Sequence, residues 1–340
     1  MKKIYSIVFN FCFVCLLVGL VGIFTTKYAV DFNFASASAS AKAITAKLAI
    51  PRSIAFVKNN SNAAILNLND GSETLIPEKF NEIKAVALSP NGDKIAIAGK
   101  LKEENGIYLA DTATKTVTGL VSKKDVFFNS PSFSSDGTLL TYIASVKNDP
   151  FSPSNIMILD IAKKAEKNIT NQKATSEINV YYNYPKFSKD SKTIICSAAN
   201  IPDVDTPRYD TIYIKKIGAD NGAGEFITGG ATTFDEKGAQ SGFKASVPTL
   251  LEDGKIGFLK IVANTERILS VVDPAKNNEV TDITPAVENI AGPSFSKDGK
   301  FVVFEIFNDD DKNPQSSINL LDVSAKSFEK IVEKGNSPSF

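Results

Sequence analysis

The feature that most constrains this chain is a repeated segment, in which a short apolar run, a polar turn and a strand of alternating apolar residues follow one another. A second pair of apolar stretches around another polar turn comes after each copy, as in "IMILDIAKKAEKNIT" (156–170). Each repeat therefore predicts four short strands, A to D, and no helix-period segment recurs. The five copies of the first part are "AVALSPNGDKIAIAG" (85–99), "SPSFSSDGTLLTYIAS" (130–145), "YPKFSKDSKTIICSA" (184–198), "VPTLLEDGKIGFLKI" (247–261) and "GPSFSKDGKFVVFEIF" (292–307).

The spacing of the repeats is that of β-propeller blades, which place four short strands in each 40 to 50 residues. Equivalent strand-A positions follow at intervals of 45, 54, 63, 45 and 45 residues; they are Leu88, Phe133, Phe187, Leu250, Phe295 and Phe340. Residues 53–77 read as strands B, C and D without an A, and the terminal "SPSF" reads as an A alone. We therefore predict an all-β, six-bladed propeller closed by a one-plus-three arrangement of these strands.

The repeats resemble those of TolB-like six-bladed β-propellers. The resemblance rests on "PSFSSDGTLLTYIAS" and "PSFSKDGKFVVFEIF", which are followed by strands "IMILDI" and "INLLDV", and it covers about residues 53–340. We expect no counterpart of the α/β domain that precedes the propeller in TolB. The resemblance implies the propeller fold, an exported protein and, as the commonest role, binding of a protein partner.

The N-terminus has the features of a targeting segment. Lys2 and Lys3 precede an uncharged apolar stretch at 4–24, and "ASASASAKA" (35–43) offers A-x-A cleavage sites. The apolar stretch is long enough either to span a bilayer or to be removed as a signal. We predict a signal peptide or membrane anchor helix at 1–30, an Ala/Ser-rich spacer at 31–50 and the propeller at 51–340. The body would then be extracytoplasmic: periplasmic, membrane-anchored or secreted.

Composition excludes several classes of function. The chain has 38 basic and 38 acidic residues, so no basic face for nucleic acid is expected. It has no histidine, which excludes Ser-His-Asp and Cys-His catalysis and imidazole metal sites. We predict a monomeric, non-catalytic propeller, with membrane contact only through 4–24 if that segment is retained.

The loops divide into two groups by strand parity. The A–B and C–D turns fall on one face of a propeller and are short here, whereas the B–C and D–A loops fall on the other and are long and dissimilar. Variable loops on a repeated scaffold are the usual place for binding residues. The alternative is that the aromatic rings pack between blades beneath the loops. The predicted binding residues are Phe127, Phe128, Tyr181, Tyr182, Tyr184 and Arg208.

Two of these loops are acidic and could hold calcium, which takes six to eight oxygen ligands. The alternative is that they are solvated charged loops. The candidate ligands are Asp203, Asp205 and Asp210 in one loop and Asp309, Asp310 and Asp311 in the other. The aspartates that recur in the A–B turns are instead predicted to support the turns themselves.

Three functions remain open from the sequence. The first is an exported scaffold that binds a protein partner in the cell envelope through the face with the long loops. The second is a metal-dependent propeller enzyme of lyase or lactonase type, for which the acidic loops would supply ligands. The third is a glycan-binding propeller, suggested by the aromatic loops.

Overall fold

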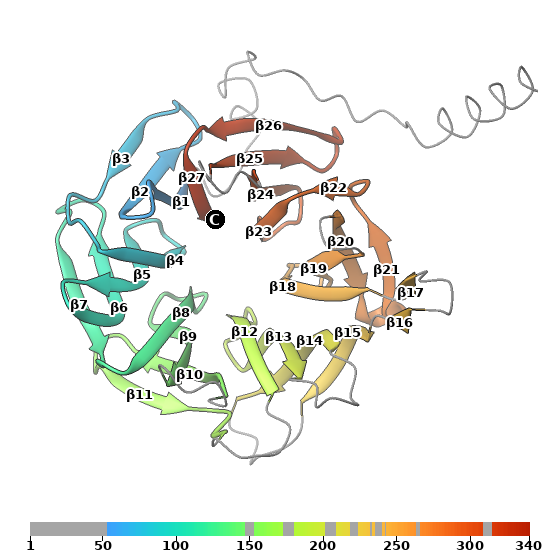
Figure 1. Cartoon of the computed structure of the whole chain (residues 1–340), viewed down its shortest axis with the longest axis horizontal. Helices are drawn as coiled ribbons and strands as arrows, with labels where there is room; N and C mark the ends of the chain where they lie inside the picture. The colour runs from blue at the N-terminus through green and yellow to red at the C-terminus, as the bar shows by residue number, and fades with distance from the viewer. Residues whose placement is uncertain are drawn as a thin grey trace, which may run out of the picture.

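Six antiparallel sheets stand around a common axis in the computed structural model (Figure 1). It describes residues 53–146, 153–172, 180–200, 209–217, 224–231, 233–234, 240–241, 243–262, 266–308 and 315–340. Within those ranges the one helical element is the 3₁₀ turn Pro274–Lys276. The predicted all-β, six-bladed propeller is therefore confirmed. The anchor helix and spacer predicted for 1–50 lie outside the described residues.

Blades 1 to 5 follow one another along the chain, and each is an A-B-C-D meander with strand A nearest the axis (Figure 1). Blade 1 contains β4 (Glu82–Leu88), β5 (Lys94–Leu101), β6 (Glu104–Asp111) and β7 (Val117–Ser122). Blade 2 contains β8 (Val126–Phe133), β9 (Leu139–Val146), β10 (Asn155–Asp160) and β11 (Ala165–Asn168). Blade 3 contains β12 (Val180–Phe187), β13 (Thr193–Asn200), β14 (Tyr209–Lys216) and β15 (Glu225–Ala231).

Blades 4 and 5 continue the pattern, with small additions at blade 4. Blade 4 contains β18 (Lys244–Leu250), β19 (Ile256–Ile261), β20 (Glu266–Asp273) and β21 (Glu279–Asp282), and β22 (Val287–Glu288) also pairs with β20. The hairpin of β16 (Thr233–Phe234) and β17 (Gln240–Ser241) precedes this blade. Blade 5 contains β23 (Ile290–Phe295), β24 (Phe301–Phe307), β25 (Ser316–Asp322) and β26 (Ser327–Val332).

The sixth sheet, blade 6, joins strands that are far apart in the sequence. Its order is β27-β1-β2-β3, with β27 (Gly335–Ser339) innermost and β1 (Ser53–Lys58), β2 (Asn62–Asn67) and β3 (Glu73–Leu75) outside it. Strand β27 runs antiparallel to β1, with Ala55 opposite Ser339 and Lys58 opposite Gly335. A bond from the Asn336 side chain to Asn60 Oδ1 (2.7 Å) adds to this pairing.

The hydrophobic core is divided into six clusters, and each lies between two neighbouring blades. Between blades 5 and 6, for example, Ile54 and Phe56 of β1 pack with Val303 of β24 and Ile318 of β25, all fully buried. Clusters of the same kind fill the other five interfaces. This arrangement explains the near-continuous apolar runs of strand B, such as the first four residues of β24, because both faces of each sheet pack on a neighbouring sheet.

The repeated A–B turn is stabilised by a serine and an aspartate two residues apart. In blade 5, Ser296 Oγ donates to Asp298 Oδ1 (2.7 Å) and accepts from the Phe301 amide (3.0 Å), and Asp298 also accepts from the Lys300 amide. The same bonds recur at Ser134 and Ser188. The predicted structural role of the turn aspartates is therefore confirmed. Partial burial raises the pKa of Asp298, but the hydrogen bonds from Ser296 and Lys300 together outweigh it and hold the pKa below its usual value.

Substitution of the turn serine should lower stability measurably. Ser296 is buried, so Ser296→Ala leaves the Phe301 amide without its acceptor, and we expect a loss of about 1–2 kcal/mol in the free energy of unfolding. Urea unfolding measures this loss. Ser324→Ala is the control, because Ser324 lies in an exposed turn where its hydroxyl donates to Asp322. Equal unfolding midpoints for Ser296→Ala and the unmodified protein would contradict the assignment.

Inner strands of five blades contain a β-bulge at a residue that precedes proline. At these bulges φ is positive, between 50° and 53°; the residues are Ser130, Tyr184, Val247, Gly292 and Ser337. Positive φ is unfavourable for a β-branched residue such as Val247. Proline also disfavours the helical region for the residue before it, so these positions store backbone strain.

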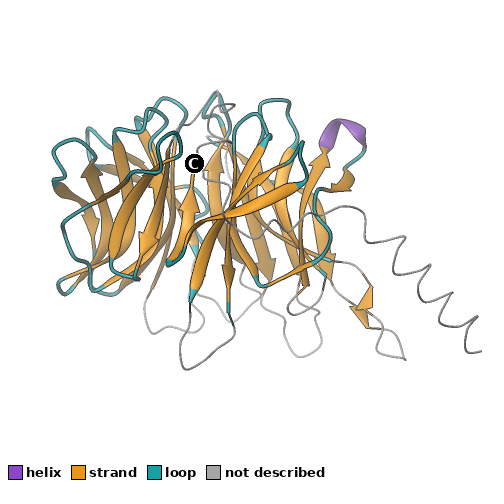
Figure 2. Ribbon diagram, turned by 90° about the horizontal axis from the view of Figure 1, so that it is seen from above, coloured by secondary structure: helices purple, strands orange, loops and turns teal. Residues whose placement is uncertain are grey.

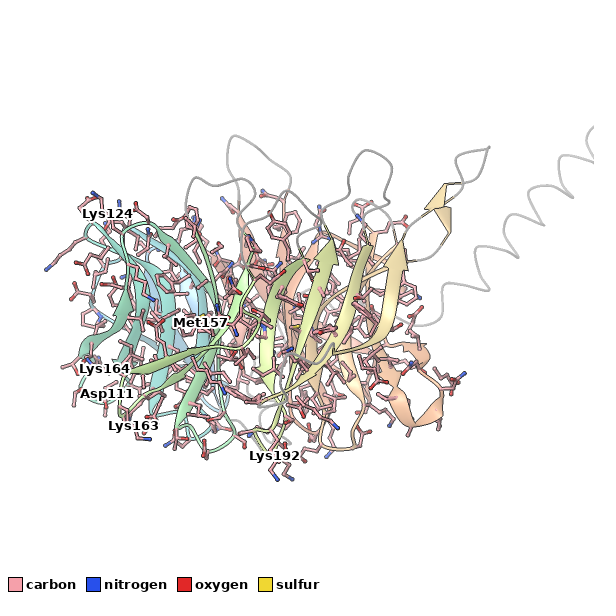
Figure 3. The ribbon with its side chains drawn as sticks, turned by 90° about the horizontal axis from the view of Figure 1, so that it is seen from below. Asp111, Lys124, Met157, Lys163, Lys164 and Lys192 are labelled. Carbon is pink, nitrogen blue, oxygen red and sulfur yellow. The ribbon has the colours of Figure 1, made fainter. Side chains whose placement is uncertain are left out.

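The propeller has two distinct faces (Figure 2). The short-turn face contains the A–B and C–D turns, and Figure 3 shows Asp111, Lys163, Lys164 and Lys192 at this rim. The long-loop face contains the B–C and D–A connections, where Lys124 lies (Figure 3). Across the described ranges, no helix has the length and apolar character needed to cross a bilayer.

Candidate functional site

The two phenylalanines predicted on the long-loop face differ in exposure. Phe127 is 41% exposed near the start of β8. Its neighbour Phe128 is only 3% exposed and packs in the core between blades 1 and 2, with its ring 5.9 Å from that of Tyr142. Successive residues of a strand point to opposite sides, which separates the two rings. Phe127 is thus the one of the pair that a partner could touch.

The three predicted tyrosines lie along β12, the inner strand of blade 3. Tyr181 and Tyr182 are half-buried, and the Tyr182 ring lies 5.6 Å from that of Tyr213 at the interface with blade 2. Tyr184 is 38% exposed and stands at the bulge of its strand. Although the residue is exposed, its hydroxyl is desolvated by the neighbouring strands, and this burial raises the pKa of Tyr184.

Two charged residues that the sequence did not single out lie near Tyr184. Arg267 at the start of β20 lowers the Tyr184 pKa, and Glu305 of β24 raises it, so both charges act on this ring. The Arg267 guanidinium lies over the Phe307 ring (5.3 Å to the centroid) and donates to the Ile290 carbonyl (2.6 Å). Arg267 is one of only three arginines in the chain, and this rarity is the sequence feature that could have singled it out.

Glu305 connects blade 5 to the closing strand. Its Oε1 accepts from Ser316 Oγ (2.5 Å) and its Oε2 accepts from the Ser337 amide of β27 (3.3 Å). The carboxylate is therefore held by two donors near the axis. Tyr184, Arg267 and Glu305 come from three different blades, which explains why spacing along the sequence could not bring them together.

A cleft of about 230 Å³ lies in blade 2, next to Lys123 of the connection that enters this blade from blade 1. Most of its surface is apolar, and Val146, 52% exposed, stands at its edge. The cleft is bounded by the first residue of β8 and the last residues of β9, which places it toward the long-loop face. Its lining residues are Lys123, Val126, Ala144, Ser145, Val146, Pro153, Asn155, Met157, Asn168 and Gln172.

A charged network fixes one wall of this cleft. Lys123 forms an ion pair with Glu166 Oε2 (2.9 Å), and the hydroxyl of the fully buried Tyr142 donates to Glu166 Oε1 (2.5 Å). Burial and the Glu166 carboxylate raise the pKa of Tyr142. The network ties the connection between blades 1 and 2 to the outer strand β11, so the cleft has a rigid boundary.

The predicted calcium ligands can be placed only in part. Asp210 at the start of β14 forms an ion pair with Lys244 of β18 (3.8 Å), which links blades 3 and 4. The described residues contain no group of three or more His, Cys, Asp or Glu side chains arranged to hold a metal. The remaining predicted ligands and the predicted binding arginine lie outside the described residues; they are Asp203, Asp205, Asp309, Asp310, Asp311 and Arg208.

Comparison with solved structures gives several propellers of similar shape. TolB from Acinetobacter baumannii matches with a TM-score of 0.62 and 20% identity over 84% of this chain and 66% of that one. A putative TolB from Agrobacterium tumefaciens gives 0.55 and 18%, covering 82% of this chain and 91% of that one. An oligogalacturonate lyase in complex with manganese gives 0.53 and 14%, covering 80% of this chain and 70% of that one.

No family model and no curated protein sequence matches the chain. At 20% identity and below, the structural matches speak for the fold, because one fold can carry unrelated functions. The chain also spans slightly less than two thirds of the length of the Acinetobacter protein. The expected resemblance to TolB is confirmed at this level: the chain has the six-bladed β-propeller fold that TolB proteins share.

Proposed function

We propose that this chain is an exported, non-catalytic propeller that binds a protein partner in the cell envelope through its long-loop face. The observation that carries the proposal is the exposure of Phe127 at the long-loop end of β8, next to Val126 in the lining of the blade 2 cleft, together with the exposure of Tyr184 at the bulge of β12. Exposed aromatic rings next to a hollow of apolar walls are typical of the centre of protein interfaces.

The charges around the axis support the same face. Arg267 is half-buried, and its Nε has no hydrogen-bond partner among the described residues. Arginine and tyrosine are the residues most enriched at the energetic centre of interfaces, because they combine apolar area with a polar group. A partner segment that reaches the axis would meet Tyr184, Arg267 and Glu305 together.

Export and closure complete the proposal. The apolar segment 4–24 would direct the propeller out of the cytoplasm, as a signal or as an anchor, so that the partner is a protein of the envelope. The pairing of β27 with β1 would serve as the one-plus-three closure that keeps the loop face rigid. A rigid scaffold reduces the ordering cost of binding.

Replacement of Phe127 should weaken partner capture at least tenfold. We expect Phe127→Ser to remove an interface anchor worth more than about 1.4 kcal/mol. The measurement is affinity capture from the native envelope, with mass spectrometry of the bound proteins. Phe226→Ser is the matched control, because Phe226 is 54% exposed in β15 at the short-turn end of blade 3. A partner retained by both variants, or lost by both, would contradict the assignment of the face.

The two other candidate functions give different results in the same preparation. The likeness to a manganese-bound lyase favours a metal-dependent enzyme as the second candidate. If the protein is such an enzyme, its melting temperature should fall in EDTA and recover when calcium or manganese is added. If it is instead a glycan-binding propeller, affinity capture from the envelope should recover carbohydrate and no protein partner.

A further inference from the structure

Lys186 is an exception to the pattern of the inner strands. It is the second-last residue of β12, and the corresponding residues of the other inner strands are small. Those residues are Ala87, Ser132, Thr249, Ser294 and Ser339. Its ammonium group donates to Thr249 Oγ1 of the neighbouring inner strand β18 (3.0 Å). A lysine at this position breaks the rule of the repeat, and such exceptions are typical of functional sites.

Among the described residues, no acidic side chain is paired with Lys186. Desolvation lowers the pKa of Lys186 to about 8, with no nearby charge contributing to the shift. Among the described strands packed against β12, β8 has no ionisable side chain. The ionisable side chains of the other packed strands are Tyr142 in β9, Asp160 in β10, Cys196 in β13 and Lys244 in β18. Two of these side chains, Asp160 and Lys244, are already in ion pairs. Asp160 pairs with Lys163, and Lys244 pairs with Asp210.

From this geometry we infer that Lys186 and Thr249 bind a carboxylate group between the inner strands β12 and β18, toward the short-turn face. Lys186 as a whole residue is half-buried although its ammonium group is desolvated, so the position is not sealed from solvent and an anion can approach it. Buried charges in proteins are normally paired, and the ammonium group has two donors left after its bond to Thr249. This site is separate from the long-loop face and does not depend on the proposed partner.

The charge at the site favours a carboxylate over a phosphate. One ammonium balances one carboxylate, whereas a phosphate dianion would bring a second negative charge into a desolvated position. The Thr249 hydroxyl can turn to donate to the second carboxylate oxygen. The carboxylate could belong to a small free acid or to the C-terminus of a peptide, and both present the same group to Lys186.

Titration with acetate and with a short peptide tests the site. Calorimetry at constant ionic strength, with chloride as the reference salt, should show binding of acetate, of the free-acid peptide, or of both. Lys186→Met should weaken that binding at least tenfold. Binding of acetate would identify a free acid as sufficient. Binding of the peptide acid but not of its C-terminal amide would identify a peptide terminus. Near pH 8, binding should also take up protons, so the measured enthalpy should vary with the ionisation enthalpy of the buffer.

Lys192→Met is the matched control. Lys192 is exposed in the A–B turn of the same blade, on the same face of the propeller (Figure 3), and its loss should leave the affinity unchanged. Lys186→Gln, which keeps a hydrogen-bond donor without the charge, should behave like Lys186→Met. The inference would be overturned if the unmodified protein bound neither probe. It would equally be overturned if Lys186→Met bound them as tightly as the unmodified protein.

Discussion

Deletion of residues 335–340 is expected to lower the free energy of unfolding by about 4 kcal/mol, a large share of the stability of an ordinary domain. The deletion removes β27, which pairs with β1, and it also removes Phe340, which packs against the core between blades 5 and 6. Ile54 and Phe56 of that core would lose cover, and exposure of such side chains costs about 1.5–3 kcal/mol each. Urea unfolding followed by circular dichroism measures the change.

The control for this deletion keeps the strand and changes one side chain. Ser339→Ala preserves the backbone pairing with Ala55, and within the described residues the Ser339 hydroxyl donates to the Phe340 carbonyl alone, so this variant should unfold near the unmodified midpoint. The urea unfolding midpoint of Phe340→Ala should lie between those of the deletion variant and Ser339→Ala. A deletion variant that unfolds at the same urea concentration as the full chain would show that blade 6 does not depend on β27.

Lys186→Met is expected to increase the free energy of unfolding by about 3 kcal/mol at pH 7 in a buffer without carboxylate. The pKa of Lys186 is about 8 in the folded chain against an ordinary value of 10.5, and each unit corresponds to about 1.4 kcal/mol. Between pH 8 and 10.5 the unfolded chain binds more protons at this residue than the folded chain. The stability of the unmodified protein should therefore rise with pH across that window.

The difference between the two unfolding curves isolates this residue. The advantage of Lys186→Met should be full below pH 8 and should disappear as the pH approaches 10.5, while titration of the other lysines and tyrosines cancels. Lys192→Met should run parallel to the unmodified protein, because its ammonium group is exposed. Parallel curves for Lys186→Met would mean that the amine is fully hydrated and that its burial has no energetic consequence.

The fold could be predicted because the repeat encodes each blade locally. The serine and aspartate of the turn, the alternating strand B and the apolar strand A recur with little change, and blade 4 shows how far the pattern can vary. There Leu251 takes the place of the turn serine, yet the turn still forms through backbone bonds such as Gly254 to Leu251. The terminal "SPSF" was assigned from the same pattern, and β27 occupies that place in the sheet of β1 to β3.

The site could be predicted less well, because it depends on contacts between blades. The sequence predicts both Phe127 and Phe128 as binding residues, whereas strand alternation places Phe127 at the surface and Phe128 in the core. Arg267 and Glu305 become neighbours of Tyr184 only when three blades close around the axis. Lys186 was visible as a departure from the small residue of the repeat, but its isolation from acidic groups follows from the packing of β12 against β18.

The division of the core between neighbouring blades has a consequence for how the propeller can fail. No sheet keeps an apolar interior of its own, since every cluster needs residues from two blades. Once one interface opens, both flanking blades expose half of their buried surface, and the remaining contacts are those of an open arc with two unprotected ends. We therefore expect the stability of each blade to depend on both of its neighbours, so that weakening one blade also weakens the two beside it.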